Sequence, residues 1–148
     1  MITADSNVFV YLHDESEPAK RAIAREVTAE LIRRESAIAL QVVGEYQNVL
    51  RRRLRVPSWI AAQEARTLLE AFEVFAPTRA NAEAALEQLA AGRLSYWDAL
   101  LLAAASDAAC TVLLSEDMQD GSVVYGVRII NPFGSDGLSA SAREALAA

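Results

Sequence analysis

The sequence predicts one α/β domain with a mainly parallel central sheet flanked by helices, and three observations predict it. The chain has 148 residues, 53% of them hydrophobic, which is enough for one core but not for two full domains. Short apolar runs rich in branched residues alternate with longer segments of helical periodicity. Alternating strands and helices favour parallel strands joined by right-handed crossovers.

The first half of the chain carries two predicted strand–helix units. Residues 2–4 are a short apolar strand, and the residues from Ser6 to Leu12 follow it as a helix. Apolar residues at helical spacing predict a long helix over 17–34. A second short strand over 37–40 precedes a helical stripe over 42–54.

The second half repeats this pattern. The predicted elements are a helix over 57–72, a strand over 74–76, helices over 78–91 and 95–108, and strands over 111–114 and 127–130. Ser95 and Asp98 have the spacing of a capping box, so Asp98 is expected at a helix N-terminus. Residues 1–133 thus form the predicted domain, and the Ser-, Ala- and Gly-rich residues 134–148 are expected to be a mobile or loosely attached tail.

Composition excludes several classes of protein. No uncharged apolar stretch approaches the roughly 20 residues that a membrane span needs, and no basic segment precedes a hydrophobic run at the N-terminus. Cys110 is the only cysteine, which excludes an internal disulfide and a cysteine-based zinc site. We therefore expect a cytoplasmic protein. The net charge of −6 argues against broad, non-specific attraction to nucleic acid, although a local basic patch remains compatible with it.

Four acidic residues stand out because of where they fall in the predicted elements. Asp5 and Asp117 follow strands, Glu45 lies early in a helix after a strand, and Asp98 opens a helix. Taken singly, each has an ordinary explanation as a helix cap or turn residue. In a parallel sheet, however, all four would face the edge at which ligands bind.

Carboxylates gathered at one edge repel one another unless protons or cations neutralise them. Mg²⁺, or Mn²⁺ in its place, takes oxygen ligands and keeps several waters, which suits a set of Asp and Glu side chains. The chemistry that such a site supports is phosphodiester hydrolysis by a metal-activated water.

The motifs around these residues resemble those of PIN-domain ribonucleases, in particular the VapC-type toxins of bacterial toxin–antitoxin pairs. The resemblance covers residues 1–133 and rests on four segments: 5–11 (DSNVFVY), 43–46 (VGEY), 95–105 (SYWDALLLAAA) and 114–121 (LSEDMQDG). It implies a PIN-like three-layer fold and a metal-binding quartet of Asp5, Glu45, Asp98 and Asp117. It also implies an RNA substrate, a homodimer, and a cognate antitoxin whose C-terminal segment enters the active-site groove.

The same resemblance makes Asn7 and Ser115 candidates for orienting the quartet, and we expect Asp120 to have the same role. The fourth motif leaves an alternative open, because Glu116 or Asp120 could assist or replace Asp117.

The candidate RNA-binding residues are Arg51, Arg52 and Arg53, which form the one dense basic cluster, and Trp97, which could stack on a base. The sole histidine, His13, is expected to be an ordinary surface residue. The alternative function is a non-catalytic PIN-like adaptor that binds RNA or protein.

Overall fold

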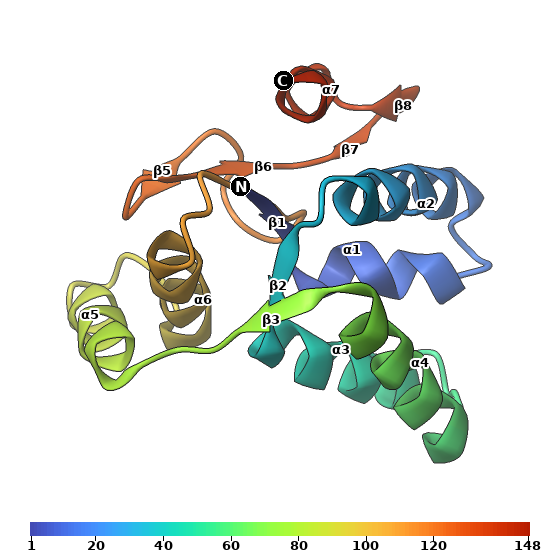
Figure 1. The fold of residues 1–148 in the computed structure, drawn as a ribbon, viewed down its shortest axis with the longest axis horizontal. Helices are drawn as coiled ribbons and strands as arrows, with labels where there is room; N and C mark the ends of the chain where they lie inside the picture. Colours follow the sequence, from blue (N-terminus) through green and yellow to red (C-terminus); the bar gives the residue numbers. More distant parts are fainter.

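A four-stranded sheet forms the centre of the computed structural model, which describes all 148 residues (Figure 1). Its strand order is β1 (Ile2–Ala4), β4 (Val112–Leu114), β6 (Val127–Ile130) and β5 (Val123–Val124). Strands β1 and β6 both pair with β4 in parallel, and only the short edge strand β5 is antiparallel. The predicted α/β class with a mainly parallel sheet is confirmed.

Two further strands, β2 (Ala37–Ala39) and β3 (Glu73–Phe75), form a parallel pair of their own. They lie next to β1 (Figure 1), and the Thr3 hydroxyl donates a 2.8 Å hydrogen bond to the Ala37 carbonyl between the two sheets. The carboxyl ends of β1 and β2 still face the same side of the molecule.

Helices flank both sets of strands, and most lie within a residue or two of their predicted bounds. They are α1 (Ser6–Val10), which continues into a short 3-10 turn (Tyr11–His13), α2 (Pro18–Arg33), α3 (Leu40–Arg52), α4 (Ser58–Ala71), α5 (Arg79–Ala90), α6 (Tyr96–Asp107) and α7 (Ala140–Ala147). Their apolar faces join the strands in one large core, and α5 packs on α6 through a small second cluster. No helix combines the length and the apolar character that crossing a membrane requires.

Two helix N-termini near the sheet edge are capped by side chains. The Asp5 carboxylate accepts the Ser6 N–H at 2.7 Å and so starts α1 directly after β1. Ser95 Oγ accepts the Asp98 N–H at 3.2 Å and starts α6. The reciprocal half of the predicted capping box, from the Ser95 backbone N–H to the Asp98 carboxylate, does not form. The Asp5 carboxylate is thus the N-cap of α1 directly after β1, and Asp98 lies in the first turn of α6.

The C-terminal segment forms a hairpin and a helix. Residues 133–138 form the antiparallel hairpin of β7 (Phe133–Gly134) and β8 (Gly137–Leu138), and α7 follows. Ala142 and Leu146 of α7 are buried and belong to the main core. The segment contains few large apolar residues, but these two are enough to attach it because α7 presents both on one face.

Candidate acidic site

Adjacent parallel strands bring the first and fourth sequence motifs together. Strand β1 ends opposite β4, with Ala4 paired to Leu114, and the Asp5 N–H donates to the Leu114 carbonyl at 2.9 Å. The next residue after β4 is Ser115, whose buried hydroxyl donates to Asp5 Oδ2 at 3.0 Å. Ser115 therefore contacts Asp5 directly through its hydroxyl.

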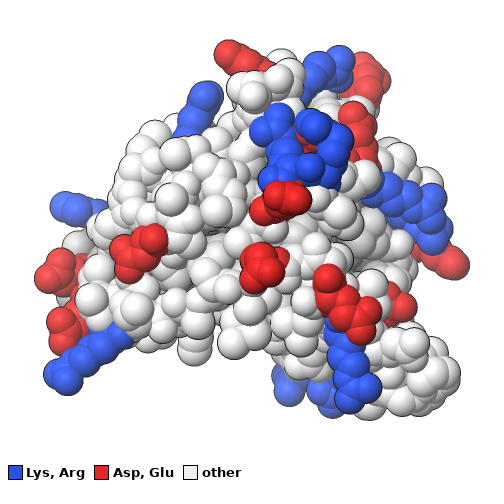
Figure 2. Space-filling model, viewed as in Figure 1, with Lys and Arg blue, Asp and Glu red and all other residues white.

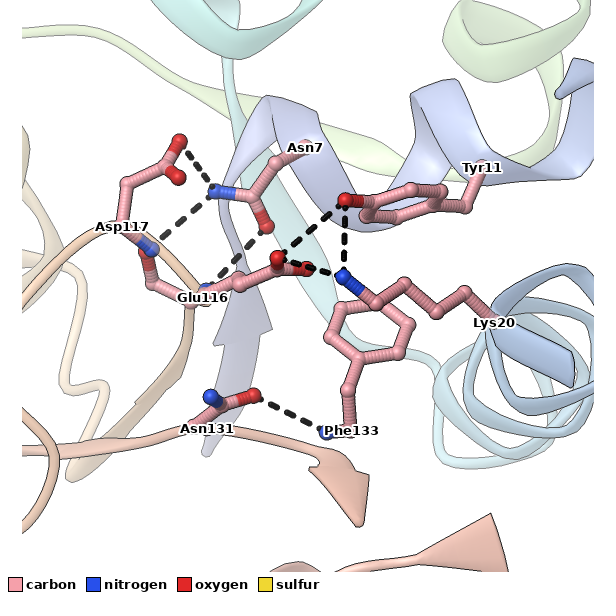
Figure 3. Close-up of polar contacts among 8 residues, drawn as sticks. Asn7, Tyr11, Lys20, Glu116, Asp117, Asn131 and Phe133 are labelled. Carbon is pink, nitrogen blue, oxygen red and sulfur yellow. Dashed lines mark hydrogen bonds and ion pairs between the residues drawn. The ribbon is translucent and has the colours of Figure 1, made fainter. Parts of the chain in front are cut away.

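Asn7 joins these strands to the loop after β4. Its Nδ2 donates to Asp117 Oδ2 at 3.1 Å (Figure 3). The same Nδ2 donates to Asp5 Oδ2 at 3.4 Å. Its Oδ1 accepts the backbone N–H of Glu116 at 3.3 Å. Because the acceptor side of the amide is taken up by an N–H, the donor side must face the two carboxylates.

Glu45 reaches the site from the second turn of α3. Its Oε2 accepts from the Ser6 hydroxyl at 3.1 Å, and its Oε1 accepts from Gln41 Nε2 at 3.0 Å. Gln41 Nε2 also donates to the Trp97 carbonyl at 3.2 Å. The Gln41 amide therefore links α3 to the first turn of α6, on which Asp98 lies.

Electrostatic coupling connects all four predicted carboxylates. Burial raises the pKa of Asp5 to about 6, against the hydrogen bonds from Ser6 and Ser115, and the charges of Glu45 and Asp98 raise it further. Burial likewise raises the pKa of Asp98, and the charges of Glu45 and Asp117 raise it further. The hydrogen bond with the Ser95 hydroxyl lowers this pKa. The four side chains therefore lie within reach of one another's charge.

No ion pair neutralises this cluster. The structure contains salt bridges at Glu30, Glu64, Glu83 and Glu116, but none at Asp5, Glu45, Asp98 or Asp117. Four carboxylates without a cationic partner are a donor set that fits a hard divalent cation. No three of them lie close enough together to hold a metal ion jointly. Mg²⁺ does not need three, because it commonly binds through one or two carboxylates and retains its waters.

Comparison with known proteins shows the family to which this fold belongs. The family model described as PIN domain matches residues 2–119, most of the chain. The chain belongs to the PIN domain family. No protein in the curated set matches it.

Two solved structures share the fold of this PIN domain. One is the Mycobacterium tuberculosis toxin VapC20, described as cleaving the sarcin–ricin loop, with 20% sequence identity and a TM-score of 0.62 over 79% of this chain and 90% of that one. The other is a toxin–antitoxin complex from Klebsiella pneumoniae, with 18% identity and a TM-score of 0.64 over 90% of this chain and 98% of that one. At these identities the likeness establishes the fold alone.

The alternative acidic residues of the fourth motif have other contacts in this PIN domain. Glu116 points away from the quartet and pairs with Lys20, whose Nζ lies 2.7 Å from Glu116 Oε1 (Figure 3). Asp120 Oδ1 accepts the backbone N–H of Asn131 at 2.8 Å. Asp120 thus fixes the end of β6, and its hydrogen bonds do not reach the carboxylates that it was expected to orient. Asp117 is the residue of this loop that faces the site.

The candidate RNA-binding residues are all exposed. On the face seen in Figure 1, acidic and basic side chains are interspersed and no continuous basic surface covers it (Figure 2). Arg53 differs from Arg51 and Arg52 because it lines a pocket of about 80 Å³ that Asn7 and Asp117 also line. Trp97 is 61% exposed beside Asp98, with its backbone held by Gln41.

Sequence reasoning missed Gln41 and Lys20. Gln41 could have been found, because it lies four residues before Glu45 and hence on the same face of a predicted helix. Lys20 gave no such signal, because its partner is 96 positions away. His13 lies elsewhere, half-buried, bonded to Tyr46 and near Glu64, so it is not the ordinary surface residue that was expected. Cys110 is buried in the core.

Proposed function

We propose that this PIN domain is a metal-dependent endoribonuclease of the VapC toxin type, and that a cognate antitoxin neutralises it. The observation that supports it most strongly is the cluster of Asp5, Glu45, Asp98 and Asp117, which are electrostatically coupled and lack a cationic partner. The family match and the two similar folds, one described as an RNA-loop-cleaving toxin and one as a toxin–antitoxin complex, agree with this proposal.

The quartet would hold Mg²⁺ or Mn²⁺, which supplies an activated water and offsets charge on the reacting phosphate. The residues around the quartet keep its carboxylates in place. Ser115 and Asn7 donate to Asp5, Asn7 also donates to Asp117, and these bonds leave the remaining carboxylate lone pairs free for ligands. Ser6 and Gln41 hold both oxygens of Glu45 in the same way.

The proposed RNA contacts flank this cluster on two sides. Arg53 is placed to bind a backbone phosphate beside Asn7 and Asp117, because a guanidinium forms strong, charge-assisted bonds with phosphate oxygens. Trp97 offers an exposed ring next to Asp98 on which an unpaired base can stack. Single-stranded or loop RNA is therefore the proposed substrate.

The antitoxin would use the same negative charge. A basic side chain inserted between the carboxylates supplies the positive charge that the chain itself does not provide. We also propose that the protein is a cytoplasmic homodimer, as expected for a toxin of this type.

Cleavage of a panel of single-stranded and hairpin RNAs with Mg²⁺ or with EDTA tests the proposal. We expect cleavage only with Mg²⁺, and its loss by at least about 100-fold in Asp5→Asn and in Asp98→Asn with folding intact. Asp136→Asn is the matched control, because Asp136 is an exposed carboxylate in the β7–β8 turn. RNA binding without cleavage would instead support the adaptor function, and undiminished cleavage by both site variants would refute the assignment.

A further inference from the structure

A partly buried ion pair between Lys20 and Glu116 lies next to the acidic site and links α2 to the loop that carries Asp117. Lys20 Nζ lies 2.7 Å from Glu116 Oε1 and 3.3 Å from the Tyr11 hydroxyl, which itself donates to Glu116 Oε1 at 3.2 Å (Figure 3). Two donors, the Lys20 ammonium and the Tyr11 hydroxyl, therefore meet at one oxygen of the Glu116 carboxylate.

Aromatic rings enclose the lysine ammonium. Nζ lies 5.0 Å from the centre of the Tyr11 ring and 5.8 Å from that of Phe133, and the two rings pack edge to face at 4.9 Å. Lys20 and Glu116 side chains are only 31% and 24% exposed. Such an enclosure fixes the ammonium in one position, which a solvent-exposed lysine would not have.

The second carboxylate oxygen of Glu116 makes the ion pair with Lys20 important for the burial of this side chain. Glu116 Oε2 is buried and accepts no hydrogen bond, so the carboxylate depends on the groups at Oε1 for its compensation. Removing the lysine charge would leave a partly buried carboxylate without a counter-charge, and the side chain would be driven toward water. We expect the backbone N–H of Glu116, which donates to Asn7 Oδ1, to shift with the side chain.

That backbone is what orients Asn7. The Glu116 N–H donates to Asn7 Oδ1, which turns the amide nitrogen of Asn7 toward Asp117. We propose that Lys20 and Glu116 are positioning residues for the acidic site, acting through the Asn7 amide. The role in metal binding rests on the proposed function, whereas the orientation of Asn7 does not.

The test replaces Lys20 and follows the site by two readouts that do not need RNA cleavage. Lys20→Met keeps most of the apolar stem but removes the charge, and Lys20→Arg retains a cation. Arg34→Met is the matched control, because Arg34 forms an ion pair of similar exposure with Glu30 about 21 Å further along α2. The first readout is NMR, which gives the hydrogen-exchange rate of the Glu116 backbone N–H and the positions of the Asn7 side-chain signals. The second readout is the dissociation constant for Mn²⁺.

In Lys20→Met we expect faster exchange of the Glu116 N–H, displaced Asn7 side-chain signals and a Mn²⁺ dissociation constant raised about 10-fold. For RNA cleavage we expect a lower kcat with little change in KM. Lys20→Arg should restore most of the Mn²⁺ affinity, and Arg34→Met should leave every site readout unchanged. If Lys20→Met does not fold, Tyr11→Phe removes one hydroxyl from the same cluster and should shift the readouts in the same direction by a smaller amount.

Unchanged exchange and Asn7 signals in the folded variant would overturn the positioning role, as would equal changes in Arg34→Met. If the wild-type protein binds no Mn²⁺ and cuts no RNA, the proposed function fails, and the exchange data still decide whether Lys20 orients Asn7.

Discussion

The Asn7 side-chain amide donates to the Asp117 carboxylate at 3.1 Å although the two residues are 110 positions apart in sequence. The same amide nitrogen reaches Asp5 at 3.4 Å. One neutral side chain therefore contacts carboxylates from the first and fourth motifs and reduces the repulsion between them. The acidic site is assembled from both ends of the domain, so its geometry depends on the sheet that brings these ends together.

Stability of the metal-free protein should fall as pH rises from about 4 to 6. Burial raises the pKa of Asp5 in the folded state to about 6, from 3.8, so the folded protein binds more protons than the unfolded chain in this range. The difference between the folded-state and unfolded-state pKa of Asp5 corresponds to about 3 kcal/mol of stability lost above pH 6. Denaturant unfolding of wild type and Asp5→Asn at several pH values measures it.

Asp5→Asn should lose the part of this dependence that comes from Asp5, while the raised pKa of Asp98 leaves a smaller slope. It should be the more stable protein at pH 7, because an amide can keep the cap on Ser6 without a charge. An identical pH slope in the two proteins would show that Asp5 is not the residue responsible.

Mg²⁺ or Mn²⁺ should raise the melting temperature, because a bound cation relieves repulsion in the folded state only. At 100 times the dissociation constant the gain is about 2.7 kcal/mol, or about 5 to 10 °C for a chain of this size. Differential scanning calorimetry at millimolar metal gives the shift. An equal shift in the Asp98→Asn variant would place the bound ion elsewhere.

Within the arginine cluster, the effect of a substitution on RNA binding should depend on how near the residue lies to the acidic site. Arg53→Ala should raise KM for RNA about 10-fold and reduce the salt dependence of binding by about one phosphate contact, because Arg53 shares a pocket with Asn7 and Asp117. The control is Arg79→Ala, since Arg79 is 93% exposed at the start of α5, whose Asn81 contacts the far end of α6. Equal effects of both variants would reduce the role of Arg53 to general surface charge.

The C-terminal helix should contribute to stability. Leu146→Ala removes a side chain that is only 7% exposed and should cost about 2 kcal/mol. Leu89→Ala is the comparison, because Leu89 is 50% exposed on α5 and its loss should change the free energy of unfolding by under about 0.5 kcal/mol. Chemical denaturation measures both values, and no loss in Leu146→Ala would mean that the tail is loosely attached after all.

Local signals in the sequence predicted most of the fold and the candidate site. Asp5 and Asp98 could be placed because a strand end and a helix cap depend on neighbouring residues alone. The split between the two sheets could not be predicted, because strand pairing is decided by contacts between residues far apart in sequence, such as the hydrogen bond from Thr3 to Ala37 across 34 positions.

Long-range contacts also distinguish between the residues that remained alternatives in the sequence. Glu116 and Asp117 are neighbours with the same chemistry, and only the position of Lys20 on α2 separates their roles. Packing of α7 was missed for a similar reason, since Ala142 becomes a core residue through its tertiary neighbours and not through its own size.

The most direct test of the account is a crystal of the protein soaked in MnCl₂ and measured for anomalous scattering. The account predicts a manganese peak within coordinating distance of Asp5 and at least one of Glu45, Asp98 and Asp117. A well-ordered crystal with no peak there, in which these carboxylates contact only neighbouring protein groups, would contradict it.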